Sequence, residues 1–124
     1  NVVELDFLPG PVTNWREITV VKDQAYVVTD VMDVGHGLQV IDISTLPDSV
    51  HLVTTFTETF TKGHIIQKDI DSEDPYVYVM GTNTTQGVHI IDITNPATPQ
   101  DAIEANPTQH HRSGLQCTRG CKGL

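Results

Sequence analysis

An internal repeat of fifty residues is the feature that most constrains this chain. The sequence GLQVIDIS at residues 37–44 recurs as GVHIIDIT at residues 87–94, and AYVV from Ala25 recurs at the same offset as PYVY from Pro75. Two separate matches at one offset indicate one supersecondary unit used twice. Such units bury their hydrophobic faces against their neighbours, so we expect two similar units packed together.

Each unit contains four segments with the composition of β-strands. Val, Ile, Tyr and Thr dominate these segments, and turn-forming pairs such as Asn95-Pro96 separate them. No stretch of ten residues has a convincing helical period, so the sequence predicts an all-β chain. The expected strands are residues 15–21, 24–29, 37–43 and 51–57 in the first unit, and 64–68, 76–81, 87–93 and 100–105 in the second.

The third strand of each unit carries apolar residues on both faces. In the first unit, Leu38 and Val40 share a face with Asp42, and Ile41 lies on the other face. Both faces are therefore expected to be covered, which is how a blade of a β-propeller packs between its neighbours. Asp42 and its repeat Asp92 end their strands, where a carboxylate caps the backbone N–H groups of the following turn.

The ordered series of motifs resembles the LVIVD repeat, a β-propeller blade, and is similar to the choice-of-anchor B family. The resemblance rests on NWREITV from Asn14, GHGLQVID from Gly35, YVYVMG from Tyr76 and GVHIIDITNP from Gly87, and it covers residues 14–117. It implies an exported propeller that is tethered to the cell surface by a C-terminal anchor. The chain departs from the family at residues 64–66, where HII replaces the usual HNI, and at residues 111–117, where HRSGLQC replaces HDAQC.

The domain organisation follows from the repeat and the resemblance. We expect a single segment over residues 1–124 that contains one blade at 15–57, a second at 63–105 and the start of a third at 110–124. Propellers have four to eight blades, so the partners are the remaining blades of a longer chain or further copies of this chain. The longer chain is favoured, because an uncovered blade face promotes aggregation.

Net charge and hydropathy limit the classes of partner that this chain can have. With 16 acidic and 7 basic residues the net charge is −9, and no basic stripe is present to neutralise a phosphate backbone. Nucleic acid is therefore excluded as a partner. The longest apolar run is far below the roughly 20 residues that cross a bilayer, so we expect no membrane span in this segment.

Glu17, His64 and, one unit further, His111 are the candidate metal ligands. Aligning Ile18 with Ile65 gives an offset of 47 residues and places the three side chains at equivalent positions in successive first strands. First strands line the central channel of a propeller, so the side chains are expected to converge. Two imidazoles and a carboxylate bind Fe(II) or another divalent transition metal and leave positions for substrate. The alternative is that these polar residues face water in the channel.

Two surface features give further candidate sites. Asn83 begins the sequon NTT in a predicted turn, where an exported eukaryotic protein accepts an N-linked glycan. The acidic run that includes Asp69, Asp71 and Glu73 resembles the start of a calcium loop. This run lacks the glycine at the sixth position and the closing glutamate of an EF-hand, so a solvated turn is favoured.

The remaining histidine and cysteine residues give weaker signals. His89 aligns with Gln39 in the repeat and is expected to be a tolerated polar position within a blade. Cys117 and Cys121 are spaced C-x3-C, which matches neither a redox pair nor a four-ligand zinc set. A disulfide between them, pairing with another segment and two free thiols all remain open.

The functional hypothesis is a binding or scaffold propeller outside the cell or on its surface, with a protein or a surface polymer as the ligand. No G-x-S-x-G, P-loop or G-x-G-x-x-G motif follows a strand, so a binding module is favoured over an enzyme and no catalytic residue is assigned. One alternative is a metal-dependent oxidoreductase with its site at the channel mouth. The other is a structural subunit of a surface or matrix that self-associates through its blade faces.

Overall fold

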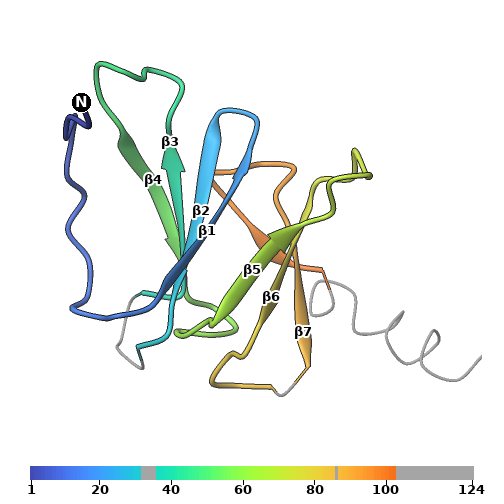
Figure 1. The fold of residues 1–124 in the computed structure, drawn as a ribbon. Helices are drawn as coiled ribbons and strands as arrows, with labels where there is room; N and C mark the ends of the chain where they lie inside the picture. Colours follow the sequence, from blue (N-terminus) through green and yellow to red (C-terminus); the bar gives the residue numbers. More distant parts are fainter. Residues whose placement is uncertain (32–35, 86, 103–124) are drawn as a thin grey trace, which may run out of the picture.

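The computed structural model describes residues 1–31, 36–85 and 87–102. Within these ranges the chain forms two antiparallel sheets of four strands each and no helix (Figure 1). The first sheet contains, in order, β1 (Arg16–Val21), β2 (Gln24–Thr29), β3 (Leu38–Asp42) and β4 (His51–Phe56). The second contains β5 (Ile65–Lys68), β6 (Tyr76–Met80), β7 (Val88–Asp92) and β8 (Gln100–Asp101). The prediction of an all-β chain with four strands per unit is confirmed.

Every strand lies inside the residue range expected from the sequence. The expected last strand, residues 100–105, is represented by β8 up to Asp101, and residues 103–105 lie outside the described residues, as does the expected third unit at 110–124. The capping prediction is also confirmed, because Asp42 Oδ1 accepts the N–H of Ser44 and Asp92 Oδ1 accepts the N–H of Thr94, each at 2.8 Å. No helix in the described part of the chain is long and apolar enough to cross a membrane.

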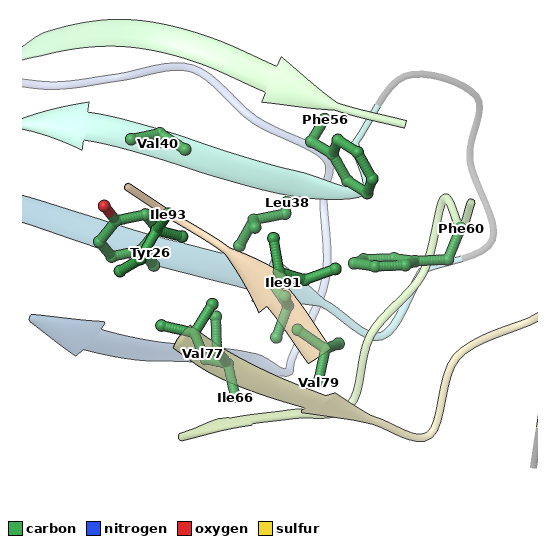
Figure 2. Close-up of a cluster of buried hydrophobic side chains, with 11 residues drawn as sticks. Tyr26, Leu38, Val40, Phe56, Phe60, Ile66, Val77, Val79, Ile91 and Ile93 are labelled. Atoms are coloured by element: carbon green, nitrogen blue, oxygen red, sulfur yellow. The ribbon is translucent and has the colours of Figure 1, made fainter. Parts of the chain in front are cut away.

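The hydrophobic core fills the space between the two sheets (Figure 2). Branched and aromatic side chains project from the facing sides of both sheets, and Phe60 joins them from the connection between β4 and β5. Burying one such side chain contributes roughly 1.5–3 kcal/mol. The core consists of Tyr26, Val28, Leu38, Val40 and Phe56 from the first sheet, Ile66, Val77, Val79, Ile91 and Ile93 from the second sheet or its end, and Phe60.

The two sheets meet through faces that are not equivalent in the repeat. Tyr26 lies on the packed face of the first sheet. The packed face of the second sheet carries Val77 and Val79, so Tyr76 and Tyr78, which alternate with them along β6, point away from the first sheet. Since Tyr26 and Tyr76 are repeat equivalents, the front of one unit packs against the back of the next. This head-to-tail arrangement leaves one face of each kind free.

The two free faces carry apolar side chains that no described residue covers fully. The first outer face, on the first sheet, exposes Ile18 by 61%, Val20 by 55% and Leu52 by 48%. The second outer face, on the second sheet, includes Ile90 and exposes Val88 by 42%. Solvated strands of an antiparallel sheet are polar on the solvent side, so these faces resemble surfaces that pack against another element.

The predicted alignment of Ile18 with Ile65 is wrong. Ile18 lies on the first outer face, whereas Ile65 pairs with Met80 on the opposite side of its unit, the second outer face. The offset of 47 residues differs by three from the fifty-residue repeat that relates the other strands. A shift by an odd number of residues moves every side chain to the other face of a strand. Glu17 and His64 are therefore not equivalent positions of the repeat.

Candidate functional site

A polar cluster closes one end of the interface between the two sheets. Asp30, at the end of β2, forms an ion pair with Lys62, whose Nζ lies 2.7 Å from Oδ1, and its Oδ2 lies 3.1 Å from His64 Nδ1. Trp15 stacks on the His64 ring, with ring centroids 4.9 Å apart, and its Nε1 donates to the His64 carbonyl oxygen at 3.3 Å. We call these four residues the Asp30 cluster.

Chain connectivity explains why these four side chains meet. Trp15 precedes β1 and Asp30 follows β2, and the N–H of Asp30 donates to the Trp15 carbonyl oxygen, so both lie at the same end of the first hairpin. The connection from β4 to β5 crosses from the first sheet to the second at this end, and it brings Lys62 and His64 over the hairpin. Gly63 between them is buried and donates its N–H to the carbonyl oxygen of Thr29.

The electrostatics of the Asp30 cluster favour the ionised carboxylate. The hydrogen bond from Lys62 is the main cause that lowers the pKa of Asp30 below its ordinary value, burial opposes it, and His64 lowers the pKa further. With Nδ1 of His64 held by the carboxylate, Nε2 is the ring nitrogen left to meet a further group. Carboxylate–imidazole pairs of this kind orient histidines that bind metals or ligands.

The three predicted metal ligands are not brought together among the described residues. Glu17 lies on the face of the first sheet that points to the second, because it pairs with Val28 of the core. His64 faces the first sheet from the other side, through its contacts with Trp15 and Asp30. His111 lies outside the described residues, within which no three side chains of His, Cys, Asp or Glu form a group that could hold a metal ion. The metal site remains a prediction.

Asn83 joins two loops through its side-chain amide. Its Oδ1 accepts the N–H groups of Thr61 and Lys62 at 3.0 and 3.1 Å, and its Nδ2 donates to Thr61 Oγ1 at 3.1 Å. Asn83 thus holds the β4–β5 connection, and with it the Asp30 cluster, against the loop after β6. A glycan at Asn83 stays a prediction, because these contacts neither require it nor test it.

The acidic loop after β5 already contains a cation. The ammonium group of Lys68 donates to the carbonyl oxygens of Asp69, Ser72 and Asp74 at 3.1, 2.7 and 2.8 Å. Backbone carbonyl oxygens of this kind are also the oxygen ligands that calcium uses. The ammonium group of Lys68 therefore binds three carbonyl oxygens of this loop, and the solvated turn stays a prediction.

His89 belongs to a buried polar network that its repeat alignment does not predict. Nδ1 of His89 lies 2.5 Å from Asp101 Oδ2, Nε2 lies 3.2 Å from Thr82 Oγ1, and the ring packs against Phe60 with centroids 5.0 Å apart. Asp101 is 5% exposed and His89 is 8% exposed. The network links the last two strands of the second sheet, and its position inside the sheet indicates a structural role.

Sequence reasoning missed Trp15, Asp30 and Lys62 as members of a site. Trp15 and Asp30 fell at the ends of predicted strands, and Lys62 fell in a connection. One signal was available in the sequence. Trp15 and Asp30 stand at the two ends of the predicted first hairpin that lie side by side, and Lys62 stands just before the next predicted strand. The two cysteines, Cys117 and Cys121, lie outside the described residues.

Comparison of the chain with protein-family models, with curated proteins and with solved structures gave no match.

Proposed function

We propose that this chain is a two-blade segment of a β-propeller that serves as a binding and scaffold module outside the cell or on its surface. The observation that carries the proposal is the head-to-tail packing of two similar four-stranded sheets through non-equivalent faces. Packing of this kind continues in one direction with each added unit and closes into a ring when the rotation allows it. β-propellers are closed arrays of such four-stranded sheets.

The free faces support the presence of further units. The second outer face carries Tyr78, Val88 and Ile90. The same side of the first unit carries Tyr26 and Val40, and there both side chains are buried against the second sheet. A neighbouring unit would bury the second outer face in the same way. The covering units are the remaining blades of a longer chain or further copies of this chain.

The exposed Asp30 cluster supports binding as the function. It presents a half-exposed Trp15 ring beside an Asp–Lys–His group at one end of the stacked sheets. Tryptophan supplies large contact area at binding surfaces, and the rim of such surfaces is polar. A protein or a surface polymer that docks on this end of the propeller is the ligand that we propose.

The assembly of the full 124-residue chain tests the architecture. Because the free faces are apolar, we expect the chain to self-associate as its concentration rises, as measured by sedimentation velocity. Ile18→Lys places a charge on the first outer face and should shift the chain to smaller species. Val12→Lys is the matched control, since Val12 is fully exposed in the N-terminal segment and belongs to neither sheet.

Two results would contradict the proposed architecture. One is a wild-type chain that stays monomeric at every concentration with a single cooperative melting transition. The other is an Ile18→Lys chain that associates as strongly as the wild type.

A metal-dependent oxidoreductase remains the second candidate, and the orientation of His64 is the observation that favours it. Asp30 lies against Nδ1 of His64, which leaves Nε2 as the ring nitrogen for a metal ion. If Glu17, His64 and His111 bind a divalent transition metal, the purified full chain should contain that metal and His64→Ala should lower its content. Elemental analysis measures this, with His51→Ala as the control. Metal-free wild-type protein, purified without chelator, would remove this candidate.

A further inference from the structure

A cleft opens between the two sheets at the end opposite the Asp30 cluster. It has a volume of about 750 Å³, which is within the range of small-molecule sites. The β1–β2 turn, the β5–β6 loop and the connection after β7 surround it, and these segments lie at the upper end of the molecule in Figure 1. We call it the interface cleft.

The Tyr26 side chain reaches the interface cleft from the hydrophobic core. Its ring packs in the core and the residue is only 1% exposed, yet it lines the cleft. In Figure 2 its hydroxyl oxygen lies at the end of the cluster away from Phe60. The hydroxyl makes no hydrogen bond to any described residue. Because Tyr26 lines the cleft, its hydroxyl is free to form a hydrogen bond with a molecule that enters the cleft.

The protonation state of Tyr26 defines what this hydroxyl can offer. Burial raises the pKa of Tyr26 to about 12. The side chain is therefore a neutral phenol at physiological pH, and it both donates and accepts a hydrogen bond. A ligand with a hydroxyl group is able to complete either bond.

The charges on the cleft favour a cation at its rim. Asp69, Glu73 and Asp74 supply three carboxylates. Lys22 and Lys68 supply two ammonium groups, but that of Lys68 is bound to three carbonyl oxygens of the loop. The net charge of the lining is negative, as is the charge of the whole chain at −9. An anionic ligand would meet repulsion at this rim.

The walls between Tyr26 and the rim are apolar. Ile93 lies in the core beside the cleft, and Ile70 and Pro75 project from the β5–β6 loop. Ile70 is 93% exposed, so a ligand body that covers it would remove apolar surface from water. The cleft thus offers a hydrogen-bonding group inside, apolar walls and a negative rim.

We propose that the interface cleft binds a small organic cation that carries an ammonium group at one end of an apolar body and a hydroxyl group at the other. The hydroxyl meets Tyr26, the body lies against Ile70 and Ile93, and the ammonium group meets the carboxylates of Asp69, Glu73 and Asp74. This site lies within the two described sheets, so it does not depend on further blades or on the Asp30 cluster.

Titration calorimetry with three probe compounds on the full chain tests the proposal. Tyramine has the ammonium group, the aromatic body and the hydroxyl. Phenethylamine lacks only the hydroxyl, and 3-(4-hydroxyphenyl)propionate replaces the cation by an anion. We expect tyramine to bind most tightly, phenethylamine more weakly, and the anionic probe least of all. Added salt should weaken the binding of the two amines, because the rim carboxylates are exposed.

The variant Tyr26→Phe removes the hydroxyl that bonds to the ligand and keeps the aromatic ring that packs in the core. Because the loss of one neutral hydrogen bond changes affinity by roughly 2–12-fold, this variant should weaken tyramine binding by about fivefold and leave phenethylamine binding unchanged. Tyr76→Phe is the matched control, since Tyr76 is the repeat equivalent of Tyr26 and lies on the second outer face. It should change neither affinity. Circular dichroism checks that both variants keep the β-sheet content of the wild type.

Three results would overturn the proposal. The first is the absence of tyramine binding up to about 10 mM, which corresponds to less than about 3 kcal/mol of binding free energy. The second is an anionic probe that binds as tightly as tyramine. The third is an equal loss of tyramine and phenethylamine affinity in Tyr26→Phe, which would show that the phenol acts only through packing.

Discussion

At the scale of single residues, Asp30 connects the two sheets. One carboxylate at the end of β2 holds Lys62 and His64, which both precede β5. The side chains of Asp30 and Lys62 are 29% and 28% exposed, so solvent screens the ion pair and its contribution to stability is small, below about 1 kcal/mol. Its value to the fold is the fixed position of the connection that leads from one sheet to the other.

The pH dependence of this ion pair is a testable prediction. The pKa of Asp30 is lowered in the folded state, so its stabilisation is present above the ordinary Asp value of 3.8 and is lost as pH falls through the folded-state value. Lys62→Met should therefore lower the melting temperature at pH 7, and its difference from the wild type should shrink below about pH 4. Thermal unfolding at fixed protein concentration, from pH 7 to pH 3, measures this.

Lys22→Met serves as the control for the loss of a charge, because Lys22 is exposed in the β1–β2 turn. Its effect on the melting temperature should be small at every pH. A Lys62→Met effect that is equally large at pH 7 and pH 3 would show that Lys62 acts through packing of its aliphatic chain and not through its charge.

At the scale of elements, the two units differ at the glycine that precedes their third strands. A Cβ atom on Gly37 would lie 2.2 Å from the carbonyl oxygen of Phe56 and 2.5 Å from that of Phe60. The chain after β4 crosses this glycine closely and cannot move aside without shifting backbone. In the second unit the repeat equivalent is Gly87, and among the described residues the nearest atom to such a Cβ is Thr85 Oγ1, at 3.5 Å.

These surroundings predict a larger effect of the same substitution at Gly37 than at Gly87. Gly37→Ala should destabilise the chain by about 2 kcal/mol or more, because overpacking against fixed atoms costs typically 1–3 kcal/mol. Gly87→Ala should change stability by less than about 1 kcal/mol. Urea unfolding of both variants, followed by tryptophan fluorescence from Trp15, compares them directly. A Gly37→Ala variant as stable as the wild type would contradict the close approach at Gly37.

At the scale of the whole molecule, the head-to-tail packing of the two sheets predicts how copies of the chain associate under the proposed function. In head-to-tail association, the first outer face of one molecule packs against the second outer face of the next molecule. The two faces in contact therefore differ in composition. A symmetric dimer would instead use the same face twice. These two modes of association make different predictions for mixtures of variants.

Mixing two variants tests which mode occurs. Ile18→Lys blocks the first outer face and Val88→Lys blocks the second. Each variant alone should remain monomeric, but an equimolar mixture should form heterodimers, because the intact face of one variant fits the intact face of the other. Sedimentation velocity of the separate and mixed proteins measures this. A mixture that stays monomeric would contradict head-to-tail association, as would a single variant that dimerises through its remaining intact face.

Local features of the fold followed from the sequence because they depend on neighbouring residues. The eight strands lie within the predicted ranges, since strand composition and turn-forming pairs act over a few residues. The carboxylates of Asp42 and Asp92 cap the turns that begin two residues later, as expected from their positions. The fifty-residue repeat likewise predicted two similar sheets, because segments of similar sequence form the same supersecondary unit.

The tertiary structure decided which side of each strand meets which partner. The mistaken alignment of Ile18 with Ile65 shows why, because a shift by an odd number of residues leaves strand composition unchanged and exchanges its two faces. The pairing of His89 with Asp101 depends on the register of β7 and β8, and the meeting of Asp30 with Lys62 depends on the path between the sheets. The sequence by itself therefore determined the strands, the turns and the repeat. The core, the Asp30 cluster and the interface cleft arise from contacts between residues distant in the chain, which local patterns do not encode.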